Sequence, residues 1–470
     1  MTETADKTLT SGTEVSFYLD GRRLKGFAGE PIAKALYRAG VTTLSHSPKY
    51  HRPRGVHCAR GRCSMCHMEV NGLPGVPTCI TPLAEGMRIR HEGFQPFYAP
   101  LLTHGLRTVS LPAGFYYRMF TRPSFLKNMF MKQVRKMAGV GRITLDRGEP
   151  AEPPPSGTLA RLHNRYDTIV VGAGIAGMSV ALAAAGRGAR VLLADEYARP
   201  GGHALGMQRD GDIAARRDEL GAQIAETGAI THCGSVTAYG FYPPATLLLG
   251  DRTAMKKVRA DSFVFATGAY DVIPLFENND TPGIFGERAI RLLLERDDFV
   301  PGTRAVIYGC GERVDDLTAL LGARGVEIAG VVDPGRTGAN GGDPGGKRMK
   351  RLSLLAVRGG DWIREAHFSE RGGAGVQVTI PCDLLIIAFA GQPAYELPYQ
   401  AGFRFALNED PLDENRVLLP AATALTESGV SFRLAGAVTG ETDWRKKLEQ
   451  GIQAGEQVQF QHDSSGEVKA

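Results

Sequence analysis

The sequence has 470 residues, of which 43% are hydrophobic and 22% charged, a balance typical of a folded globular protein and not of a disordered or fibrous one. The 55 Lys and Arg residues exceed the 50 Asp and Glu residues only slightly, giving a net charge of +5 that does not indicate a nucleic-acid-binding protein. At about 150 residues per domain, the length predicts about three domains.

The N-terminus has no basic stretch followed by an apolar core, so no signal peptide is expected. Residues 1–14 are interpreted as a flexible tail. The longest uncharged run, residues 169–186, is a candidate membrane span by hydropathy. Its spaced glycines and β-branched start favour a strand, a turn and a buried helix instead. We therefore expect no membrane span and a cytoplasmic location.

Residues 15–92 are predicted to form a small domain. Val15, Phe17 and Leu19 alternate with polar residues, as in a half-buried strand. Asp20-Gly21 then supplies a hairpin turn, and a helix is expected over 30–38. A hairpin, a helix and then a cysteine-rich loop is the order of a β-grasp ferredoxin-like domain.

Four of the seven cysteines follow the spacing C-x4-C-x2-C-x12-C: Cys58, Cys63, Cys66 and Cys79. The first three positions match the plant-type pattern of [2Fe–2S] ligands, in which a fourth cysteine follows later. Zinc is the alternative, because four thiolates also form a tetrahedral site, although zinc ribbons usually have two CxxC pairs. An odd total with one tight group argues against a disulfide framework. The spacing therefore predicts a [2Fe–2S] metal centre.

Basic residues without any acidic residue surround this cysteine motif: Lys49, Arg52, Arg54, Arg60 and Arg62. Cations near a negatively charged cluster favour its reduced form. A solvated basic loop, or a surface that docks an acidic partner, are the alternatives. The nearby histidines are interpreted as surface or packing residues: His46, His51, His57 and His67.

Residues 93–148 contain apolar residues at mixed helical spacings with Lys and Arg between them. This pattern favours a helical connector packed on the next domain. A basic amphipathic helix on a membrane surface is the alternative. The stretch 149–157 (EPAEPPPSG) is typical of a stiff linker, so 93–163 is interpreted as connector and linker.

From residue 164 onward, strand-like and helix-like segments alternate, as in a doubly wound α/β domain. A short apolar strand leads into Gly172, Gly174 and Gly177, and an alanine-rich helix follows. In such a turn the first glycine allows the bend, the second lets the backbone approach a pyrophosphate, and the third allows the helix to pack on the strand. With Ile175 and Ala176, these residues form the expected dinucleotide-binding turn.

The next strand ends at Asp195-Glu196, about 20 residues further on, where an acidic residue is expected to bind a ribose hydroxyl. No arginine takes its place, so a 2′-phosphate is not expected.

A second unit of the same kind starts at Arg304 and reaches Gly309-Cys310-Gly311. Val314 stands where the third glycine is expected, which would crowd the helix against the strand. A retained fold without a bound nucleotide is favoured, and NAD binding is the alternative. Cys310 is interpreted as a buried small residue, and 335–346 as a glycine-rich surface loop.

Further glycine motifs distinguish the kind of dinucleotide: Gly201, Gly202, Ala266, Thr267, Gly268 and Gly436. Together they resemble the flavoproteins with two dinucleotide-binding domains, the relatives of the pyridine-nucleotide-disulfide reductases. This resemblance implies FAD, with the Ala266–Gly268 segment at the seam between the FAD and NAD domains and Gly436 along the ribityl chain. Ala437 replaces the usual acid, which removes one ribityl contact. No cysteine pair follows Gly202, which excludes disulfide reduction, and His203 is a weaker candidate for a residue near the flavin.

Residues 15 to about 460 resemble the α subunits of heteromeric amine-oxidising flavoenzymes, a group that includes sarcosine oxidase, opine and hydroxyproline dehydrogenases and hydrogen cyanide synthase. Beside the four cysteines, the resemblance rests on the segments 48–55 (PKYHRPRG), 113–117 (AGFYY) and 279–283 (NDTPG). The chain ends soon after Gly436, without the folate-binding half of sarcosine oxidase α subunits, so transfer of formaldehyde to folate is not expected.

The resemblance implies a division of labour. A separate β flavoprotein subunit would oxidise the C–N bond of an amine or amino acid, and electrons would pass between its flavin, the [2Fe–2S] cluster and the FAD of this chain. No acid–base pair or nucleophile stands out in the sequence, so no catalytic residue is named. A self-contained NADH-dependent reductase, and a structural subunit that keeps the cofactor folds without chemistry, are the alternatives.

The expected fold is α/β, with a ferredoxin-like domain followed by a Rossmann-type flavoprotein with two dinucleotide-binding domains. The expected boundaries are 1–14 for the tail, 15–92 for the ferredoxin-like domain, 93–163 for connector and linker, 164–300 and 381–470 for the two parts of the FAD-binding domain, and 301–380 for the second, NAD-type domain.

Overall fold

The computed structural model describes residues 12–47, 52–92, 125–126, 128–129, 159–208, 211–251, 254–334, 348–350, 352–370, 378–389, 391–408 and 417–460. Most of the predicted tail and connector, the whole linker 149–157 and the loop 335–346 lie outside these residues, as does the AGFYY segment. The chain forms two compact units, Met1–Ala151 with Ile273–Ala388, and Glu152–Val272 with Phe389–Ala470.

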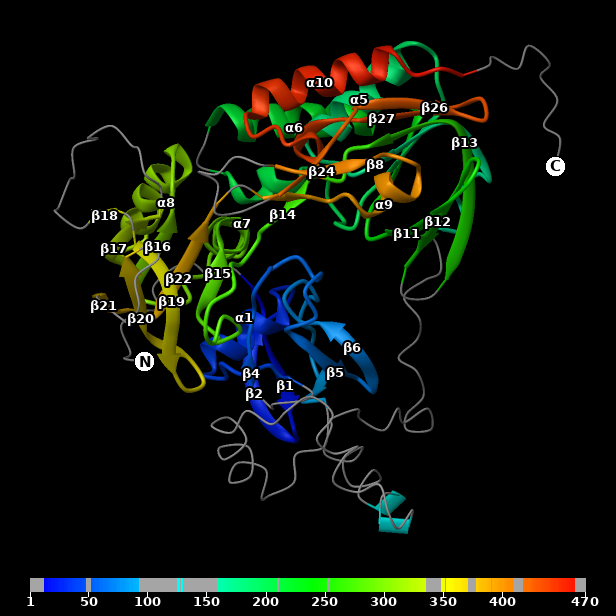
Figure 1. Cartoon of the computed structure of the whole chain (residues 1–470). Coiled ribbons are helices and arrows are strands. Elements are labelled where there is room, and N and C mark those ends of the chain that lie inside the picture. Colours follow the sequence, from blue (N-terminus) through cyan, green and yellow to red (C-terminus); the bar gives the residue numbers. More distant parts are fainter. Residues whose placement is uncertain are drawn as a thin grey trace. The chain divides into compact units, whose positions relative to one another are not determined.

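The first unit begins with a small five-stranded sheet and one helix (Figure 1). Its elements are β1 (Glu14–Leu19), β2 (Arg22–Phe27), α1 (Ile32–Arg38), β3 (Ser45–His46), β4 (Pro53–Arg54), β5 (His67–Val70), β6 (Leu73–Pro77) and β7 (Arg88–Arg90). The strand order is β2-β1-β7-β5-β6, with β1 antiparallel to β2 and parallel to β7. Asp20 and Gly21 close the first hairpin with positive φ angles of 49° and 88°, as the sequence predicts. Phe17 of the sheet and Leu36 of the helix are fully buried.

A parallel sheet forms the second part of this unit. Its elements are β15 (Ile284–Gly286), α7 (Glu287–Arg291), a π-helical turn (Leu292–Arg296), β16 (Arg304–Gly309), α8 (Glu312–Ala323), β17 (Glu327–Asp333), β18 (Arg348–Lys350) and β22 (Leu384–Ala388). The order is β15-β22-β16-β17-β18, with every pair parallel. An antiparallel sheet of β19 (Leu352–Gly359), β20 (Ile363–Glu370) and β21 (Val378–Pro381) belongs to the same unit. The structure differs here from the expected boundaries at 300 and 380, because β15 and β22 both hydrogen-bond within this sheet.

The second unit contains the first glycine-rich turn. Its elements are β8 (Arg165–Val171), α5 (Ile175–Gly186), β9 (Val191–Ala194), a 3₁₀ helix (Gly202–Gly206), α6 (Gly211–Glu226), β10 (Ile230–Cys233), β11 (Thr237–Tyr242), β12 (Thr246–Gly250), β13 (Met255–Phe265), β14 (Ala269–Tyr270), β23 (Gln392–Pro393), α9 (Glu396–Gln400), β24 (Phe405–Leu407), β25 (Leu418–Pro420), β26 (Ala424–Glu427), β27 (Val430–Leu434), a 3₁₀ helix (Gly436–Thr439) and α10 (Trp444–Glu456).

The main sheet of this unit has the order β10-β9-β8-β13-β12-β11, and β27 joins it beside the end of β13. The strands β10, β9, β8, β13 and β27 are parallel neighbours, whereas β12 and β11 form an antiparallel meander. Two segments far apart in the sequence therefore build one sheet, since the whole second dinucleotide-type domain lies between β13 and β27 in the chain.

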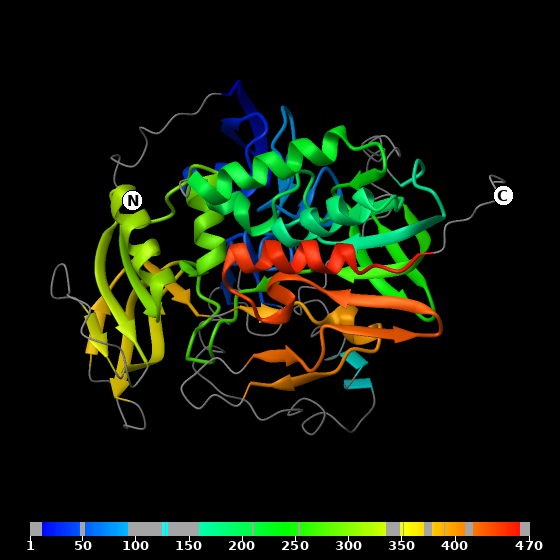
Figure 2. The same cartoon turned by 90° about the horizontal axis from the view of Figure 1, so that it is seen from above.

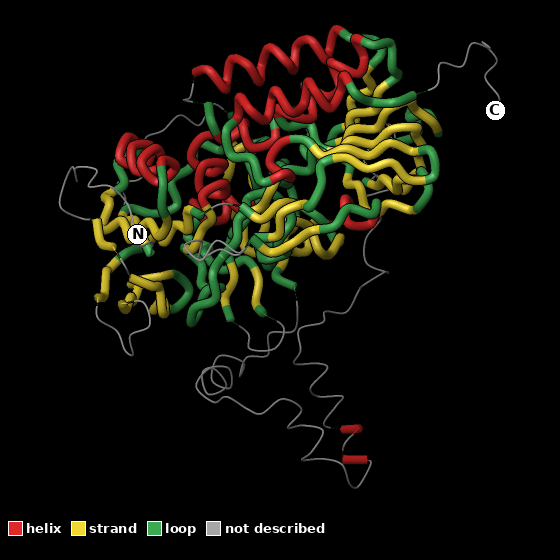
Figure 3. The backbone as a smooth tube through the Cα atoms, turned by 45° about the horizontal axis from the view of Figure 1, so that its top comes forward, coloured by secondary structure: helices red, strands yellow, loops and turns green. Residues whose placement is uncertain are grey.

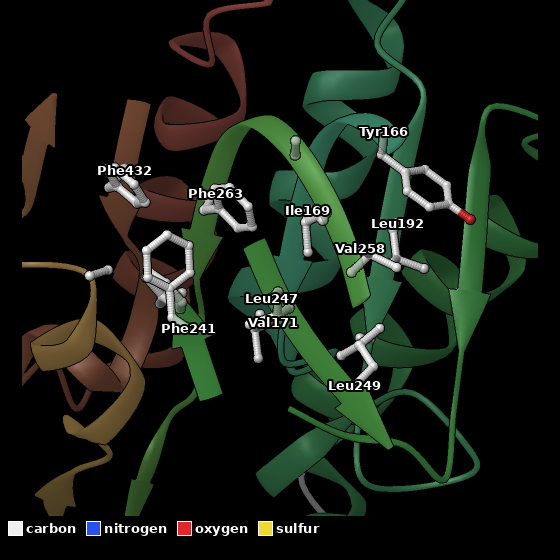
Figure 4. Close-up of a cluster of buried hydrophobic side chains, with 14 of the residues drawn as sticks. Tyr166, Ile169, Val171, Leu192, Phe241, Leu247, Leu249, Val258, Phe263 and Phe432 are labelled. Atoms are coloured by element: carbon white, nitrogen blue, oxygen red, sulfur yellow. The ribbon is translucent and has the colours of Figure 1, made fainter. Parts of the chain in front are cut away.

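Alternate residues of β8 face two different cores, as expected for a strand that is covered on both faces. Ile169 packs on one face with an aromatic group in which the rings of Phe263 and Phe432 are stacked at 5.7 Å and Phe241 meets both edge-on (Figure 4). Val170 packs on the other face, which α5, α6 and α10 cover.

Helices α5 and α10 run side by side on that second face (Figures 1 and 2), and Figure 3 shows them in red against the yellow strands. Glycines on α10 permit the close approach, because a Cβ atom at Gly451 would lie 2.4 Å from the carbonyl oxygen of Ala176. The run 169–186 is thus a buried strand, a turn and a helix, and within the described ranges no helix is long and apolar enough to cross a membrane.

Candidate cofactor sites

The cysteine loop of the first unit gathers all four predicted ligand residues. Cys58, Cys63 and Cys66 lie between β4 and β5, and Cys79 follows β6. The side chain of Cys58 is within hydrogen-bond distance of Cys63 and Cys79, and Cys66 is within hydrogen-bond distance of Cys79. The sulfur atoms therefore form a row of close pairs in the order 63, 58, 79 and 66.

The loop bends around these sulfur atoms through three residues with positive φ, Ala59 (51°), Gly61 (75°) and Ser64 (59°). The bend turns backbone N–H groups inward. The N–H of Arg60 lies 3.4 Å from the Cys58 sulfur, and the N–H of Gly61 lies 3.3 Å from the Cys79 sulfur. Such N–H donors favour negative charge on the sulfur atoms.

The pKa values of the four thiols are divided by their mutual contacts. Hydrogen bonds with Cys63 and Cys79 lower the pKa of Cys58, whereas the hydrogen bond with Cys58 raises the pKa of Cys63. The same effect lowers the pKa of Cys66 and raises that of Cys79. A group of thiols in this arrangement shares few protons between several sulfur atoms, which is the condition under which iron replaces protons.

The donor set fits a [2Fe–2S] cluster. The end pairs of the row, Cys58 with Cys63 and Cys66 with Cys79, supply two thiolates for each of two irons. No group of three or more His, Cys, Asp or Glu side chains in the described ranges is arranged to hold a single metal ion. The fit therefore rests on the type and pairing of the donors and not on a closed cage around one ion.

Two residues near the cluster loop have no signal in the sequence. The buried phenol of Tyr37 on α1 accepts a hydrogen bond from the N–H of Val56 at 2.5 Å, and its ring meets Trp362 edge-on at 5.5 Å. Arg296 donates to the carbonyl oxygen of Ala59 at 3.1 Å. Both contacts join residues that are distant in sequence but belong to the same compact unit.

The basic and histidine residues predicted around the cluster have mixed outcomes. Arg52 forms an ion pair of 3.5 Å with Asp280, within the NDTPG segment. His46, His57 and His67 are half-buried. Lys49 and His51 lie outside the described residues.

In the second unit, the predicted glycine positions come together at the end of β8. A Cβ atom on Gly172, whose φ is 104°, would lie 2.3 Å from the carbonyl oxygen of Ala266. A Cβ atom on Gly177 would lie 1.8 Å from the carbonyl oxygen of Gly172, so only glycine lets α5 begin at Ile175 this close to the strand.

The remaining predicted glycines border the same turn. Gly174 pairs with Gly201 as a parallel bridge, and a Cβ atom on Gly202 would lie 3.0 Å from Cα of Gly174. A Cβ atom on Gly436 would lie 2.6 Å from the Cβ of Ala176. The backbone around the start of α5 is therefore bare of side chains on several sides, as a cradle for a pyrophosphate requires.

The two acidic residues at the end of β9 differ in their contacts. Asp195 accepts hydrogen bonds from the N–H groups of Ala173 (2.5 Å) and Tyr197 (2.7 Å), so its carboxylate fixes the glycine turn itself. Glu196 is half-buried. Sequence reasoning assigned the ribose to this pair without distinguishing the two residues, because both follow the same strand.

The other predicted positions are held by backbone contacts within the second unit. Thr267 donates its hydroxyl to the carbonyl oxygen of Ala394 (2.8 Å), and the Ala394 N–H donates to the Gly268 carbonyl (2.9 Å). Gln450 of α10, which sequence reasoning missed, accepts from the Gly436 N–H at 3.0 Å. His203 is half-buried in the short 3₁₀ helix.

The second glycine turn, at the end of β16, keeps part of the same design. A Cβ atom on Gly309 would lie 2.2 Å from the carbonyl oxygen of Ala388, and Gly311 has a φ of 82°. Val314 is almost fully buried, and α8 forms from Glu312 despite it. The interpretation of Cys310 as a buried residue is wrong, because its place in the turn leaves it exposed.

Comparison with known proteins bears on both sites. Residues 12–93 match the model of a 2Fe-2S iron-sulfur cluster binding domain, and residues 170–233 match that of an NAD(P)-binding Rossmann-like domain. The predicted fold class is confirmed. A crystal structure of L-proline dehydrogenase from P. horikoshii has the same fold, with a TM-score of 0.65 and 18% identity over 97% of this chain and 75% of that one.

Curated relatives indicate which kind of polypeptide this is. The chain is 28% identical to the alpha subunit of sarcosine oxidase from Rhizobium meliloti (strain 1021), over 83% of this chain and 41% of the relative. This chain resembles the α subunits of heteromeric amine-oxidising flavoenzymes. One of the two opine oxidase chains compared from Rhizobium meliloti, that of the same strain, is 28% identical over 37% of this α-subunit-like chain and 40% of the relative. The chain thus spans about two fifths of the length of these relatives.

The resemblance predicted from the sequence motifs is confirmed by these relatives. The iron–sulfur domain match supports a [2Fe–2S] cluster, and the Rossmann-like match together with the fold supports FAD as the second cofactor of the α-subunit-like chain.

Proposed function

We propose that this chain is the electron-transfer subunit of a heteromeric flavin-dependent oxidase or dehydrogenase that acts on the C–N bond of an amine or amino acid. The observation that carries the proposal is the presence, in one chain, of a cysteine loop suited to a [2Fe–2S] cluster and a glycine turn suited to a dinucleotide. Relatives named as subunits of sarcosine oxidase and opine oxidase support the choice of substrate class.

The protein residues have separate roles in this proposal. Cys58, Cys63, Cys66 and Cys79 hold the cluster, and the N–H groups of Arg60 and Gly61 offset the negative charge of the sulfur atoms. The turn from Gly172 to Gly177 binds the pyrophosphate of FAD, with its shape fixed by Asp195. When bound, the cluster supplies one-electron and the flavin two-electron redox chemistry.

A partner completes the activity in this proposal. A β flavoprotein subunit, in a cytoplasmic hetero-oligomer, contributes the site at which the amine is oxidised. The α-subunit-like chain then needs no acid–base pair of its own, because it exchanges electrons and not substrate protons.

The test is an anaerobic absorption spectrum of the purified chain, with iron and acid-released flavin measured on the same sample. About one FAD and two irons per chain, with the visible bands of a [2Fe–2S] centre, are expected. Cys79→Ser should lose the iron and keep the flavin, whereas Cys310→Ser, outside the cysteine loop, should keep both. Zinc in place of iron, or nucleotide without flavin, would overturn the proposed mechanism.

The alternative of a self-contained NADH-dependent reductase has a specific structural basis, because the second turn retains the close approach of Gly309 to Ala388 and the positive φ of Gly311. Rapid bleaching of the flavin by NADH, without any partner, would favour that function over the electron-transfer role.

A further inference from the structure

Within the first unit, Arg296 reaches from the parallel sheet domain to the cysteine loop. It is the last residue of the π-helical turn Leu292–Arg296, in which the N–H of Asp297 donates to the carbonyl oxygen of Leu292 at 3.0 Å. Such turns are rare and are frequent at functional sites. One guanidinium nitrogen of Arg296, Nη1, donates to the Ala59 carbonyl at 3.1 Å, and Nη2 approaches the Cys79 carbonyl at 3.5 Å.

The guanidinium is fixed from its other edge by Asp297. Nε and Nη2 of Arg296 each lie 2.7 Å from one carboxylate oxygen of Asp297, which makes a bidentate pair. The Asp297 side chain is almost fully buried and that of Arg296 is one-fifth exposed. The Asp297 carbonyl in turn accepts a hydrogen bond from Lys34 of α1 at 2.6 Å. The pair therefore presents its positive end to the cysteine loop and its negative end away from it.

This arrangement has an electrostatic consequence at the predicted cluster. Reduction adds an electron to a group that already carries four thiolates, and a cation held in a partly buried site favours the more negative state. Arg296 contacts the backbone of Cys79, one of the predicted ligands, and of Ala59, which follows another. Its side chain is therefore placed where its charge acts on the cluster with little screening.

We propose that Arg296 is a positioning residue for the [2Fe–2S] cluster, which anchors the cysteine loop to the parallel sheet domain and raises the reduction potential of the cluster. The inference rests on the proposed cluster at the four cysteines. It adds a residue from outside the ferredoxin-like domain to the control of that cluster.

The test is a redox titration of the purified full chain followed by electron paramagnetic resonance, with iron measured on each sample. Arg296→Gln leaves the Asp297 carboxylate unpaired near the loop, so it should lower the midpoint potential most. The double variant Arg296→Gln with Asp297→Asn removes both charges and should lower it less. Asp297→Asn alone should raise it above that of the wild type.

Two further variants separate charge from folding. Arg324→Gln is the matched control, because Arg324 pairs with the neighbouring Asp298 and that ion pair does not involve the cysteine loop. It should leave the potential unchanged. Arg296→Lys keeps the charge but loses the planar fork, so it should hold the potential near the wild-type value and release iron faster to a chelator.

The outcomes distinguish this inference from the proposed function. Equal potentials in the wild type and Arg296→Gln, at equal iron content, would overturn the role of Arg296 and leave the cluster standing. A shift in Arg324→Gln as large as that in Arg296→Gln would also overturn it. Wild-type protein that binds no iron would overturn both proposals.

Discussion

The two glycine-rich turns, one in each unit, share their first position and differ at their last. At Gly172 and Gly309 alike, a Cβ atom would lie 2.2–2.3 Å from a carbonyl oxygen of the neighbouring strand segment, Ala266 or Ala388. At the third position the first turn has Gly177, closed against Gly172, whereas the second has the buried Val314.

The comparison teaches which glycine carries which information. The first glycine of each turn is demanded by the crossing of two adjacent strands, so it reports on the sheet whether or not a nucleotide binds. The third glycine is demanded only where the helix starts close above the strand, the arrangement that brings its N-terminus to a pyrophosphate. A lone pair of glycines after a strand therefore predicts the fold better than it predicts a cofactor.

The largest effect is expected from Gly177→Ala. The added methyl group would lie 1.8 Å from the Gly172 carbonyl oxygen, so α5 must move from β8. We expect loss of bound flavin and a decrease in the free energy of unfolding of about 3 kcal/mol. The measurements are the flavin-to-protein ratio and urea unfolding.

The matched control for Gly177→Ala is Val314→Ala, at the equivalent position of the second turn. It removes two buried methyl groups and should lower stability by about 1–2 kcal/mol while the flavin stays bound. A Gly177→Ala protein that retains flavin and wild-type stability would remove the distinction drawn between the two turns.

A smaller effect is expected from Asp195→Asn. The amide keeps one acceptor oxygen for the N–H groups of Ala173 and Tyr197, so one of these donors loses its partner. The protein without flavin should lose about 1–3 kcal/mol of stability, measured by thermal unfolding. In the neighbouring variant Glu196→Gln, flavin binding should weaken without that loss of stability. The reverse result would assign the turn-fixing role to Glu196.

His232 on β10, in the unit of the first turn, should make stability depend on pH. It is partly buried, which lowers its pKa below the usual 6.5, and its Nε2 atom has no hydrogen-bond partner among the described residues. As the pH falls, the unfolded chain binds this proton first, so the stabilising contribution that is present above pH 6.5 is lost as the pH falls through the folded pKa.

His232→Phe should therefore lose less stability than the wild type when the pH is lowered from about 7.5 to about 5.5, the range in which histidine titrates. The measurement is urea unfolding at both pH values. Equal losses in the two proteins would mean that His232 gains its proton without cost in the folded state.

The smallest effect is expected at Cys310, in the second turn. Burial raises the pKa of Cys233 to about 11 and that of Cys382 to about 12, so these thiols should react slowly with iodoacetamide, whereas Cys310 is exposed. Mass spectrometry should find Cys310 alkylated before the other two, at a rate that NADH does not change. Protection by NADH would mean that the second turn binds a nucleotide in spite of Val314.

Local patterns predicted the parts of the fold that depend on local geometry. The Asp20-Gly21 hairpin, the helix found at Ile32–Arg38 and the strand, turn and helix around Gly172 follow from residues within a few positions of each other. The cysteine spacing likewise named four residues that the structure brings together, because three of them share one loop.

Other features depend on contacts that no spacing encodes. Arg296 meets Ala59 only because the parallel sheet domain packs on the ferredoxin-like domain in the same unit. Strands β15 and β22 join the second sheet although the apparent motifs of that domain start at Arg304, so the domain boundaries could not be read from the motifs alone. The exposure of Cys310 is set by the turn, and an apolar neighbourhood in sequence gave no sign of it.

The late strand β27 has a consequence for how the chain is made. It pairs with Ser262–Phe265 of β13, and α10, further on, covers α5. On the ribosome, the whole inserted domain emerges before either element, so one edge of β13 and the apolar face of α5 stay uncovered through that time. The nascent chain is therefore most exposed to aggregation and to chaperone binding just before its last segment is synthesised.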